Sequence, residues 1–136
     1  MRTKQRAAAV IFRKKKFLLI HRQKNAEDYY IFPGGGIEDT ETPKEAVIRE
    51  INEELNLRIK IARKLFEFEN LGNKEYYYLI KEFSGRMKVI GDSITNKNIR
   101  DSADWYSLEK LNEINLLPPK VKRKILNLQR KGLFDS

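Results

Sequence analysis

Three glutamates, Glu50, Glu53 and Glu54, have the spacing in this chain that most strongly suggests chemistry. Positions i, i+3 and i+4 of a helix are neighbours, so these carboxylates would share one flank. Like charges at this spacing repel by roughly 0.2–0.5 kcal/mol per pair, and the fold gains nothing from it. A hard cation such as Mg²⁺ would relieve the repulsion, because it takes oxygen ligands and often binds substrate phosphates as well. A solvated acidic face is the alternative, which three glutamates alone would favour.

Local signals predict the helix that carries these glutamates. Thr42 is a good N-cap, Pro43 suits the first helical position, and Glu45 lies three residues after the cap, which together make a capping box. The helix is therefore predicted to begin at Pro43 and to end near residue 55, with Asn56 in a left-handed conformation after it. A helical wheel predicts one apolar stripe facing a core, formed by Val47, Ile48, Ile51 and Leu55.

A glycine turn before the helix makes the pattern more specific. Together, the turn and the helix resemble the Nudix hydrolase signature, in which glycine, glutamate and an Arg-Glu pair precede two adjacent glutamates. Asn56 stands where the family has glycine, which weakens the helix end but removes no metal ligand. Six of the matches are fixed residue types, and the other two need only an aliphatic residue. If each residue type has a frequency of roughly one in fifteen, the six fixed matches would arise together by chance about once in ten million sequence windows. The matching positions are Gly35, Glu41, Arg49, Glu50, Ile51, Glu53, Glu54 and Leu57.

The resemblance implies a magnesium site on this helix. Glu53 and Glu54 match the principal metal ligands, and Glu50 matches a third ligand or the group that handles the proton of the attacking water. The backbone carbonyl of Gly34 is the expected ligand from the glycine turn. The implied cofactor is Mg²⁺, for which Mn²⁺ can substitute.

Two further residues of the signature are expected to support the metal site. Glu41 is expected to support the metal shell. Arg49 can reach Glu53 at i+4, and its planar guanidinium suits a forked hydrogen bond that orients a carboxylate. Arg49 is therefore predicted to be structural rather than substrate-binding.

Outside the signature, the candidates are weaker. Arg22 follows the second predicted strand, where family members often have a basic residue facing the substrate phosphates; a surface charge is an equal alternative. Many members place a further acid before the last strand, and Asp92 and Asp101 both lie in that region. His21 is the only histidine and is predicted to be structural.

Composition describes a small charged domain. The chain has 136 residues, a formal net charge of +9 and no cysteine, which excludes disulfides and thiolate metal sites. No apolar run approaches the roughly 20 residues of a membrane span, so a cytoplasmic location is expected, with no membrane partner. The charge favours anionic partners, but no nucleic-acid-binding signature appears, so nucleotides are expected rather than nucleic acid. A monomer or a homodimer is expected.

The hydrophobic pattern predicts strands on both sides of the central helix, and helices at the C-terminal end. We expect one domain over residues 1–136, an α/β/α sandwich with a mixed sheet, which is also the Nudix fold. Residues 91–102 are predicted to be a loop, and the last helix should bury Val121, Ile125 and Leu128. The predicted strands are 7–12, 17–20, 29–32, 58–69, 75–83, 87–90 and 103–107, and the predicted later helices are 108–111 and 119–131.

The function expected from the resemblance is hydrolysis of a nucleoside diphosphate linked to another group. The short chain resembles MutT-type enzymes, so a nucleoside triphosphate pyrophosphohydrolase is the first expectation. Tyr29 or Tyr30 could stack on a base, whereas Phe32 is expected in the core. The alternatives are a diadenosine polyphosphate or ADP-sugar hydrolase and, from another class, a non-catalytic nucleotide- or nucleic-acid-binding module on the same scaffold.

Overall fold

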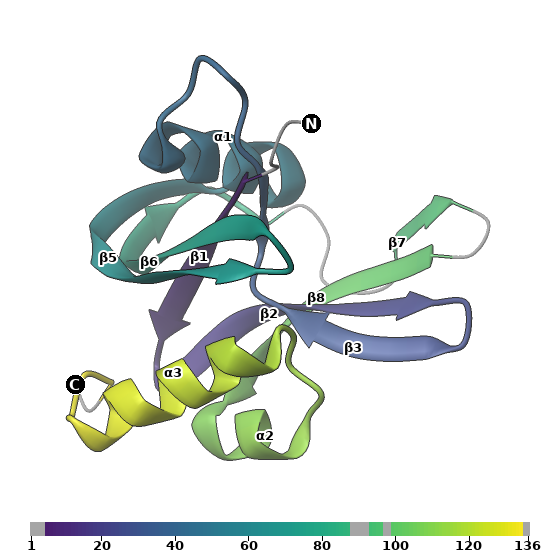
Figure 1. Cartoon of the computed structure of the whole chain (residues 1–136). Coiled ribbons are helices and arrows are strands. Elements are labelled where there is room, and N and C mark those ends of the chain that lie inside the picture. Colours follow the sequence, from purple (N-terminus) through teal and green to yellow (C-terminus); the bar gives the residue numbers. More distant parts are fainter. Residues whose placement is uncertain (1–4, 88–92, 97–98, 135–136) are drawn as a thin grey trace. The chain divides into compact units, whose positions relative to one another are not determined.

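The computed structural model describes residues 5–87, 93–96 and 99–134. These ranges contain eight strands and three helices (Figure 1). The chain separates into two compact units: residues 1–11 with 32–88, and residues 12–31 with 89–136. No helix in the described ranges is both long and apolar enough to cross a membrane.

The first unit contains a mixed sheet around β1 (Gln5–Arg13), of which residues 5–11 belong to this unit. β1 is parallel to β6 (Asn73–Ser84) and antiparallel to the short β4 (Gly34–Gly36). β6 in turn forms an antiparallel hairpin with β5 (Arg58–Asn70) (Figure 1). The glycine segment, predicted as a turn, is therefore a strand paired to β1.

The α1 helix (Pro43–Leu55) begins and ends as predicted. Thr42 Oγ1 accepts the Glu45 amide at 3.2 Å, and Glu45 Oε1 accepts the Thr42 amide at 2.9 Å, so the capping box is complete. Asn56 has φ 59° and ψ 33°, the left-handed conformation expected of the residue that replaces glycine. Its side chain also donates to the carbonyl of Arg86 at 3.0 Å.

The buried face of α1 differs from the predicted stripe at one position. The helix packs on β4 and β5, and the prediction that Ile48 faces the core was wrong, because its side chain is 43% exposed. Ala46, which lies beside the opposite edge of the predicted stripe, is fully buried instead of Ile48. The small alanine lets the helix approach the sheet on the glutamate side. The buried residues are Ala46, Val47, Ile51 and Leu55.

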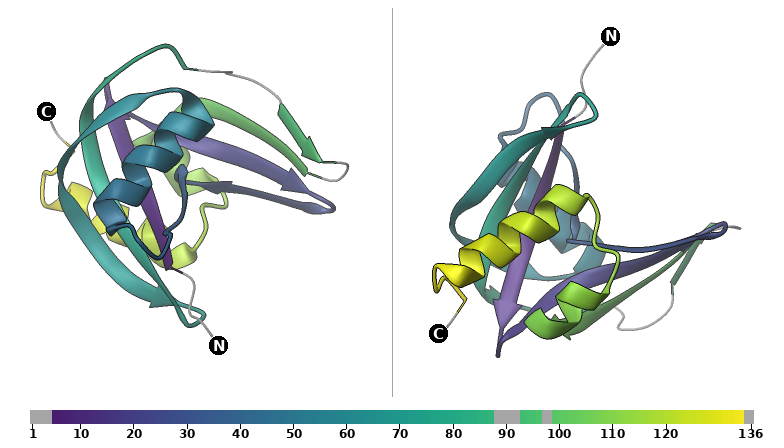
Figure 2. Two further views of the ribbon diagram at one scale, coloured as in Figure 1. Left: turned by 90° about the horizontal axis from the view of Figure 1, so that it is seen from above. Right: turned by 60° about the horizontal axis from the view of Figure 1, so that its bottom comes forward.

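The second unit contains an antiparallel sheet in the order β3 (Glu27–Ile31), β2 (Lys16–Lys24), β8 (Ile99–Ser107) and β7 (Ser93–Asn96) (Figure 2). The prediction of a loop over 91–102 was wrong for residues 93–96 and 99–102, because these form the paired antiparallel strands β7 and the start of β8. These residues are polar and lack the alternation that predicts a strand. The strand predicted at 87–90 lies outside the described residues except for Met87, which is not in a strand.

Two helices follow β8 in the second unit. Ser107 caps α2 (Leu108–Glu113), the helix predicted over 108–111, by accepting a hydrogen bond from the Lys110 amide at 3.1 Å. The α3 helix (Pro119–Arg130) buries Val121 and Ile125 fully, whereas Leu128 is only half-buried. After α3, the ring of Phe134 lies 5.1 and 5.0 Å from those of Phe12 and Phe17, which flank the β1–β2 turn.

Two hairpin turns have positive φ at both of their turn residues. Lys14 and Lys15 have φ 52° and 64° between β1 and β2. Leu71 has φ 52° and Gly72 has φ 82° between β5 and β6. Two-residue turns with positive φ at both positions match the twist of the strands they join, although they favour glycine and asparagine. Leu71 is 94% exposed at the tip of its hairpin.

Candidate active site

The β4 glycines bring the backbone close to the helix carboxylates. Phe32, just before them, is 1% exposed, as expected for a core residue, and its carbonyl accepts a hydrogen bond from Arg6 at 2.5 Å. A Cβ added at Gly35 would lie 2.3 Å from Oε2 of Glu50. The Glu50 carboxylate therefore lies in the space that any larger residue at position 35 would fill.

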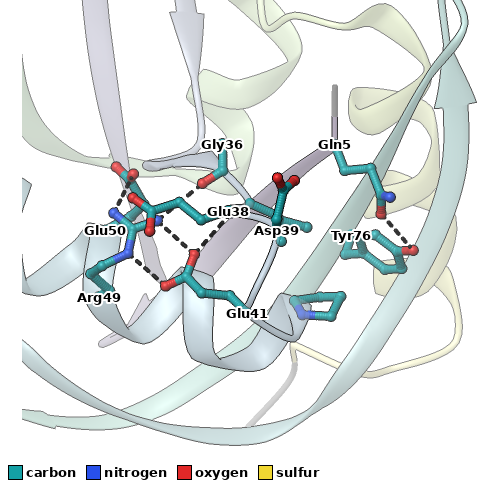
Figure 3. Close-up of a pocket in the computed structure, with 10 residues that line it drawn as sticks. Gln5, Gly36, Glu38, Asp39, Glu41, Arg49, Glu50 and Tyr76 are labelled. Atoms are coloured by element: carbon teal, nitrogen blue, oxygen red, sulfur yellow. Dashed lines mark hydrogen bonds and ion pairs between the residues drawn. The ribbon is translucent and has the colours of Figure 1, made fainter. Parts of the chain in front are cut away.

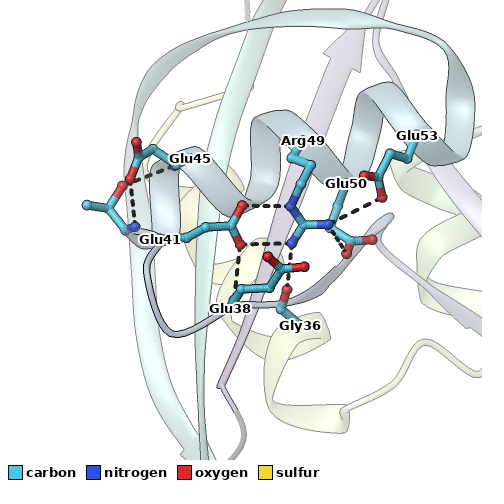
Figure 4. Close-up of polar contacts among 8 residues, drawn as sticks. Gly36, Glu38, Glu41, Glu45, Arg49, Glu50 and Glu53 are labelled. Atoms are coloured by element: carbon cyan, nitrogen blue, oxygen red, sulfur yellow. Dashed lines mark hydrogen bonds and ion pairs between the residues drawn. The ribbon is translucent and has the colours of Figure 1, made fainter.

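Arg49 is the hub of the acidic cluster (Figure 4). Its guanidinium forks onto Glu41, with Nε to Oε2 at 2.6 Å and Nη2 to Oε1 at 2.8 Å. Nη1 donates to Oε1 of Glu50 at 2.9 Å and to Oε2 of Glu53 at 3.3 Å. Nη2 also donates to the carbonyl of Gly36 at 3.1 Å. One cation thus joins the helix carboxylates to the glycine strand.

The contacts of Arg49 differ from the predicted geometry in one detail. The forked hydrogen bond is made to Glu41, whereas Glu53 receives a single, longer bond. All five N–H groups of the guanidinium have an acceptor, so none remains for a substrate phosphate. The hydrogen bonds from Arg49, and then the Glu38 amide, lower the pKa of Glu41 to about 2. The hydrogen bonds that Arg49 donates to Glu41 and Glu50 raise the pKa of Arg49.

A cavity of about 860 Å³ lies beside this network (Figure 3). Sequence reasoning missed several of its lining residues. Glu38 and Asp39 follow the glycines directly, and their acidic character next to the signature was an available signal. Tyr76, in the predicted strand 75–83, also lines the cavity, and its hydroxyl donates to Gln5 at 3.1 Å. The lining comprises Gln5, Gly36, Ile37, Glu38, Asp39, Glu41, Pro43, Arg49, Glu50 and Tyr76.

The donor chemistry of this region suits a hard cation. Carboxylate oxygens are the ligands that Mg²⁺, Ca²⁺ and Mn²⁺ prefer, and the Glu53 side chain is 60% exposed. Among the described residues, no three acidic or histidine side chains converge on one point. One oxygen of Glu50 and one of Glu53 are instead bonded to Arg49. The residue types therefore fit a divalent ion, and side-chain rotation would be needed to enclose it.

The candidates outside the helix lie in the second unit. Arg22 and Asp101 are register partners on β2 and β8 and form a bidentate pair, with distances of 2.8 and 2.9 Å. The hydrogen bonds that Arg22 donates to Asp101 raise the pKa of Arg22 despite partial burial. Asp92 lies outside the described residues. His21 bonds Asp28 at 2.5 Å and stacks on Tyr30 with ring centroids 4.2 Å apart, an arrangement that fits the predicted structural role.

The fold and the site together define a class: an α/β domain with a mixed sheet, whose capped helix presents clustered carboxylates beside a glycine strand. The chain belongs to the Nudix hydrolase family, because the NUDIX domain model matches residues 2–128. Members of this family generally use divalent metal ions. The family and the α/β fold class predicted from the signature are confirmed.

Solved structures share this fold. A solution structure of the E. coli ORF135 protein has a TM-score of 0.73 and 22% identity, and covers 95% of this chain and 92% of that protein. A MutT structure, from a study of the Aliivibrio salmonicida and Vibrio cholerae proteins, has a TM-score of 0.74 and 19% identity, with coverages of 93% and 99%. At these identities the likeness concerns the fold.

Among curated proteins, the chain is similar to diphosphoinositol polyphosphate phosphohydrolase 2 of Mus musculus. The identity is 32% over 110 residues, which are 78% of this chain and 59% of the relative. The human protein of the same name matches to the same extent. The chain thus spans about three-fifths of the length of these curated relatives.

Proposed function

We propose that this protein is a Mg²⁺-dependent pyrophosphohydrolase of nucleoside diphosphate-linked substrates. The observation that carries the proposal is the Arg49 network, in which one saturated guanidinium arranges Glu41, Glu50 and Glu53 beside a cavity. A purely solvated acidic face would need no such internal counter-ion.

In this proposal, the glutamates and the glycine strand hold the metal. Glu53 and Glu54 are the principal metal ligands, and Glu50 and the Gly34 carbonyl are the remaining ligands from the protein. When bound, the ion would neutralise charge on the diphosphate and make bound water a better nucleophile. Mn²⁺ is expected to substitute for Mg²⁺.

The neighbouring residues position the ligands. Glu41 is largely buried, with a side chain 14% exposed, and it anchors Arg49 through the fork. Arg49 then orients Glu50 and Glu53, and Gly35 leaves the space that Glu50 occupies. Glu50, whose carboxylate lies closest to the glycine backbone, is the proposed acceptor for the proton of the attacking water.

Nucleoside triphosphates, cleaved to monophosphate and pyrophosphate, are the substrates we propose first. A cavity of about 860 Å³ is large enough for a nucleotide, and the Tyr76 ring at its wall offers a face for a base. We propose that Arg22 contacts a substrate phosphate through Nη1, the guanidinium nitrogen that is not bonded to Asp101. We also propose Asp101 as the additional acid that many family members place before the last strand. Diadenosine polyphosphates should be poorer substrates, and ADP-ribose poorer still.

A second substrate class is favoured by the curated relatives. They are named for diphosphoinositol polyphosphates, which carry a diphosphate on a polyphosphorylated ring. The same metal site would serve both classes, because the bond cleaved is a phosphoanhydride in each. The net charge of +9 also suits a densely phosphorylated ligand.

Replacing Glu53 with glutamine tests the mechanism, because the change keeps the shape and removes the charge. We expect Glu53→Gln to lower kcat at least a hundredfold, or about 2.7 kcal/mol of transition-state stabilisation. Glu82→Gln, an exposed acid on β6, is the matched control and should retain activity. Hydrolysis that survives Glu53→Gln, or that is undiminished in EDTA, would rule out the proposed metal site.

A substrate panel scored by kcat/KM, with products identified by mass, tests the choice of substrate. A tenfold lead for diphosphoinositol polyphosphate, a dinucleoside polyphosphate or ADP-ribose would overturn the triphosphate proposal and leave the metal site intact. Water labelled with heavy oxygen would identify the phosphorus attacked. No turnover of any substrate with Mg²⁺ or Mn²⁺ would favour the non-catalytic binding module.

We also propose that residues 1–136 act as a single NUDIX domain in the cytoplasm, as a monomer or homodimer. The continuous family match over residues 2–128, which includes sequence from both compact units, supports the single domain.

A further inference from the structure

Arg6, Glu75 and Tyr77 lie behind the candidate site, on the β1 and β6 strands of the first unit. In front, Gln5 and Tyr76 line the cavity and are hydrogen-bonded to each other (Figure 3). Successive side chains of a strand point to opposite faces of the sheet, so Arg6 and Tyr77 point away from the cavity. Glu75, two residues before Tyr77, shares its face. The proposed mechanism uses none of these three residues.

Glu75 is a buried acid, with 6% of its surface exposed. Tyr77, which is 1% exposed, donates its hydroxyl to Oε1 of Glu75 at 2.7 Å. Asn70 donates its side-chain amide to Oε2 at 3.0 Å. A buried carboxylate is costly unless its oxygens are hydrogen-bonded, and here each oxygen has a donor. The carboxylate and the phenol are therefore held in fixed positions inside the first unit.

The Tyr77 hydroxyl connects Glu75 to Arg6. Burial raises the pKa of Tyr77, the nearby Arg6 guanidinium opposes this shift, and the hydrogen bond to Glu75 adds to it. Arg6 and Glu75 are also register partners on the parallel strands β1 and β6, so their backbones are adjacent. A cation, a protonated phenol and a carboxylate are thus neighbours on one face of the sheet.

Arg6 extends this network to the segment that leads into β4. Its Nη2 donates to the carbonyl of Phe32 at 2.5 Å. The next carbonyl along the chain, that of Pro33, accepts the Ala9 amide at 2.8 Å. The two carbonyls that precede β4 are therefore each held by a residue of β1, one through a side chain and one through the backbone.

β4 in turn contacts the acidic cluster at two points. The carbonyl of Gly36 accepts a hydrogen bond from Arg49 at 3.1 Å. At Gly35, a Cβ would lie 2.3 Å from Oε2 of Glu50, so the backbone and this carboxylate are already close. A shift of β4 would therefore move both the Arg49 network and the space that Glu50 occupies.

We infer that Arg6, held in place by Tyr77 and Glu75, is a positioning residue that fixes β4 and, through it, the metal ligands. The inference rests on the proposed function, in which Glu50 and the Gly34 carbonyl bind the metal. In this role Arg6 contacts neither the metal nor the substrate. Residues that orient metal ligands from behind typically contribute about tenfold to a hundredfold to metal affinity or activity.

A network that only stabilises the fold is the alternative. Breaking such a network would lower the melting temperature but leave metal binding by the folded protein unchanged. The acceptor that Arg6 uses favours positioning, because the Phe32 carbonyl lies two residues before Gly34 and on the same chain segment. The two roles therefore predict different results for metal affinity, which an experiment can separate.

The test uses single variants of the full chain. Arg6→Met removes the donors and keeps the length, Arg6→Lys keeps a cation, and Tyr77→Phe removes only the hydroxyl. Arg58→Met, an exposed cation of the same unit, and Tyr78→Phe, a tyrosine 3% exposed on the opposite face of β6, are the matched controls. Thermal melting establishes that each variant folds, and Tyr77→Phe provides the test if Arg6→Met does not fold.

Electron paramagnetic resonance measures Mn²⁺ binding without substrate. We expect Arg6→Met to weaken the affinity at least about tenfold and Tyr77→Phe about threefold, with Arg6→Lys between the wild type and Arg6→Met. The kcat for a nucleoside triphosphate should fall in parallel, while KM changes less than about twofold, and both controls should stay within about twofold of the wild type. A lower melting temperature with unchanged Mn²⁺ affinity would overturn the inference in favour of a fold-stabilising role.

Amide hydrogen exchange at Ala9 tests the position of β4 without any metal. Because this amide is bonded to the Pro33 carbonyl, Arg6→Met should speed its exchange at least about tenfold relative to Tyr78→Phe. Unchanged exchange would overturn the inference, whatever the metal does. Failure of the proposed function has a different signature, since Glu53→Gln would then bind Mn²⁺ as well as the wild type does.

Discussion

α1 and α3 are amphipathic helices of 13 and 12 residues that both begin with proline in the first turn, yet their charges are organised in opposite ways. On α1, the carboxylates converge on Arg49, and an internal counter-ion fixes where each one points. On α3, the cations spread along the helix with no acid among residues 119–131. Convergent charge with an internal partner suits a small ligand in fixed geometry, whereas charge spread along a helix defines no such geometry.

The largest of the remaining effects should come from removing the hub of α1. Lysine at position 49 keeps the charge but cannot form the fork or reach three carboxylates at once. We expect Arg49→Lys to lower kcat about thirtyfold, or about 2 kcal/mol, with little change in KM. Steady-state kinetics measures this split, with Lys44→Arg on the same helix as the control. An unchanged kcat would show that the carboxylates orient without Arg49.

A smaller loss should follow from displacing a single carboxylate. In Gly35→Ala, the new Cβ would lie 2.3 Å from the Glu50 carboxylate, so that flexible side chain must move. We expect about a tenfold loss in kcat, or about 1.4 kcal/mol, with the melting temperature nearly unchanged. Gly36→Ala is a matched control, because the nearest atom to its Cβ would be 3.9 Å away. Equal activity in the two variants would show that displacing the Glu50 carboxylate does not affect catalysis.

Residue patterns predicted α1 well because its signals are local. Thr42, Glu45 and Asn56 satisfy the helix ends through bonds within a few residues, so the sequence was sufficient to place both ends. The Glu41 fork joins residues eight apart across a loop, and the Glu38 and Asp39 positions at the cavity depend on how that loop folds. Those features require tertiary structure, as do the pairing of Arg22 with Asp101 and the polar β7–β8 hairpin.

The two helices also differ in how they begin, and this difference predicts a stability effect. Thr42 caps α1 with its side chain, whereas Pro118 provides no side-chain cap for α3. Thr42→Ala should therefore reduce the free energy of unfolding by about 1 kcal/mol, the usual value of an N-cap. Chemical denaturation measures the change, and Thr40→Ala, on the exposed loop nearby, is the control. A loss no larger than that of the control would mean that α1 is held by packing alone.

The smallest effect concerns an acid outside the site. Hydrogen bonds from Lys64 and then Lys74 lower the pKa of Glu67 from 4.5 to about 2. A lowered pKa contributes stability that is complete above pH 4.5 and is lost as pH falls through about 2. The melting temperatures of the wild type and Glu67→Gln should therefore differ near neutral pH and converge near pH 2. In a Lys64→Met and Lys74→Met background, the difference should be absent at every pH.

The tip of the β5–β6 hairpin has a consequence for how this protein can be changed. Leu71 holds a left-handed conformation that costs an L-residue roughly 1–2 kcal/mol, and it does so while almost fully exposed. Asparagine, which adopts that conformation more readily, should stabilise the fold and remove an apolar side chain from the surface. Leu71→Asn alone should thus increase the free energy of unfolding. With this added stability, the protein could tolerate destabilising substitutions that alter its choice of substrate.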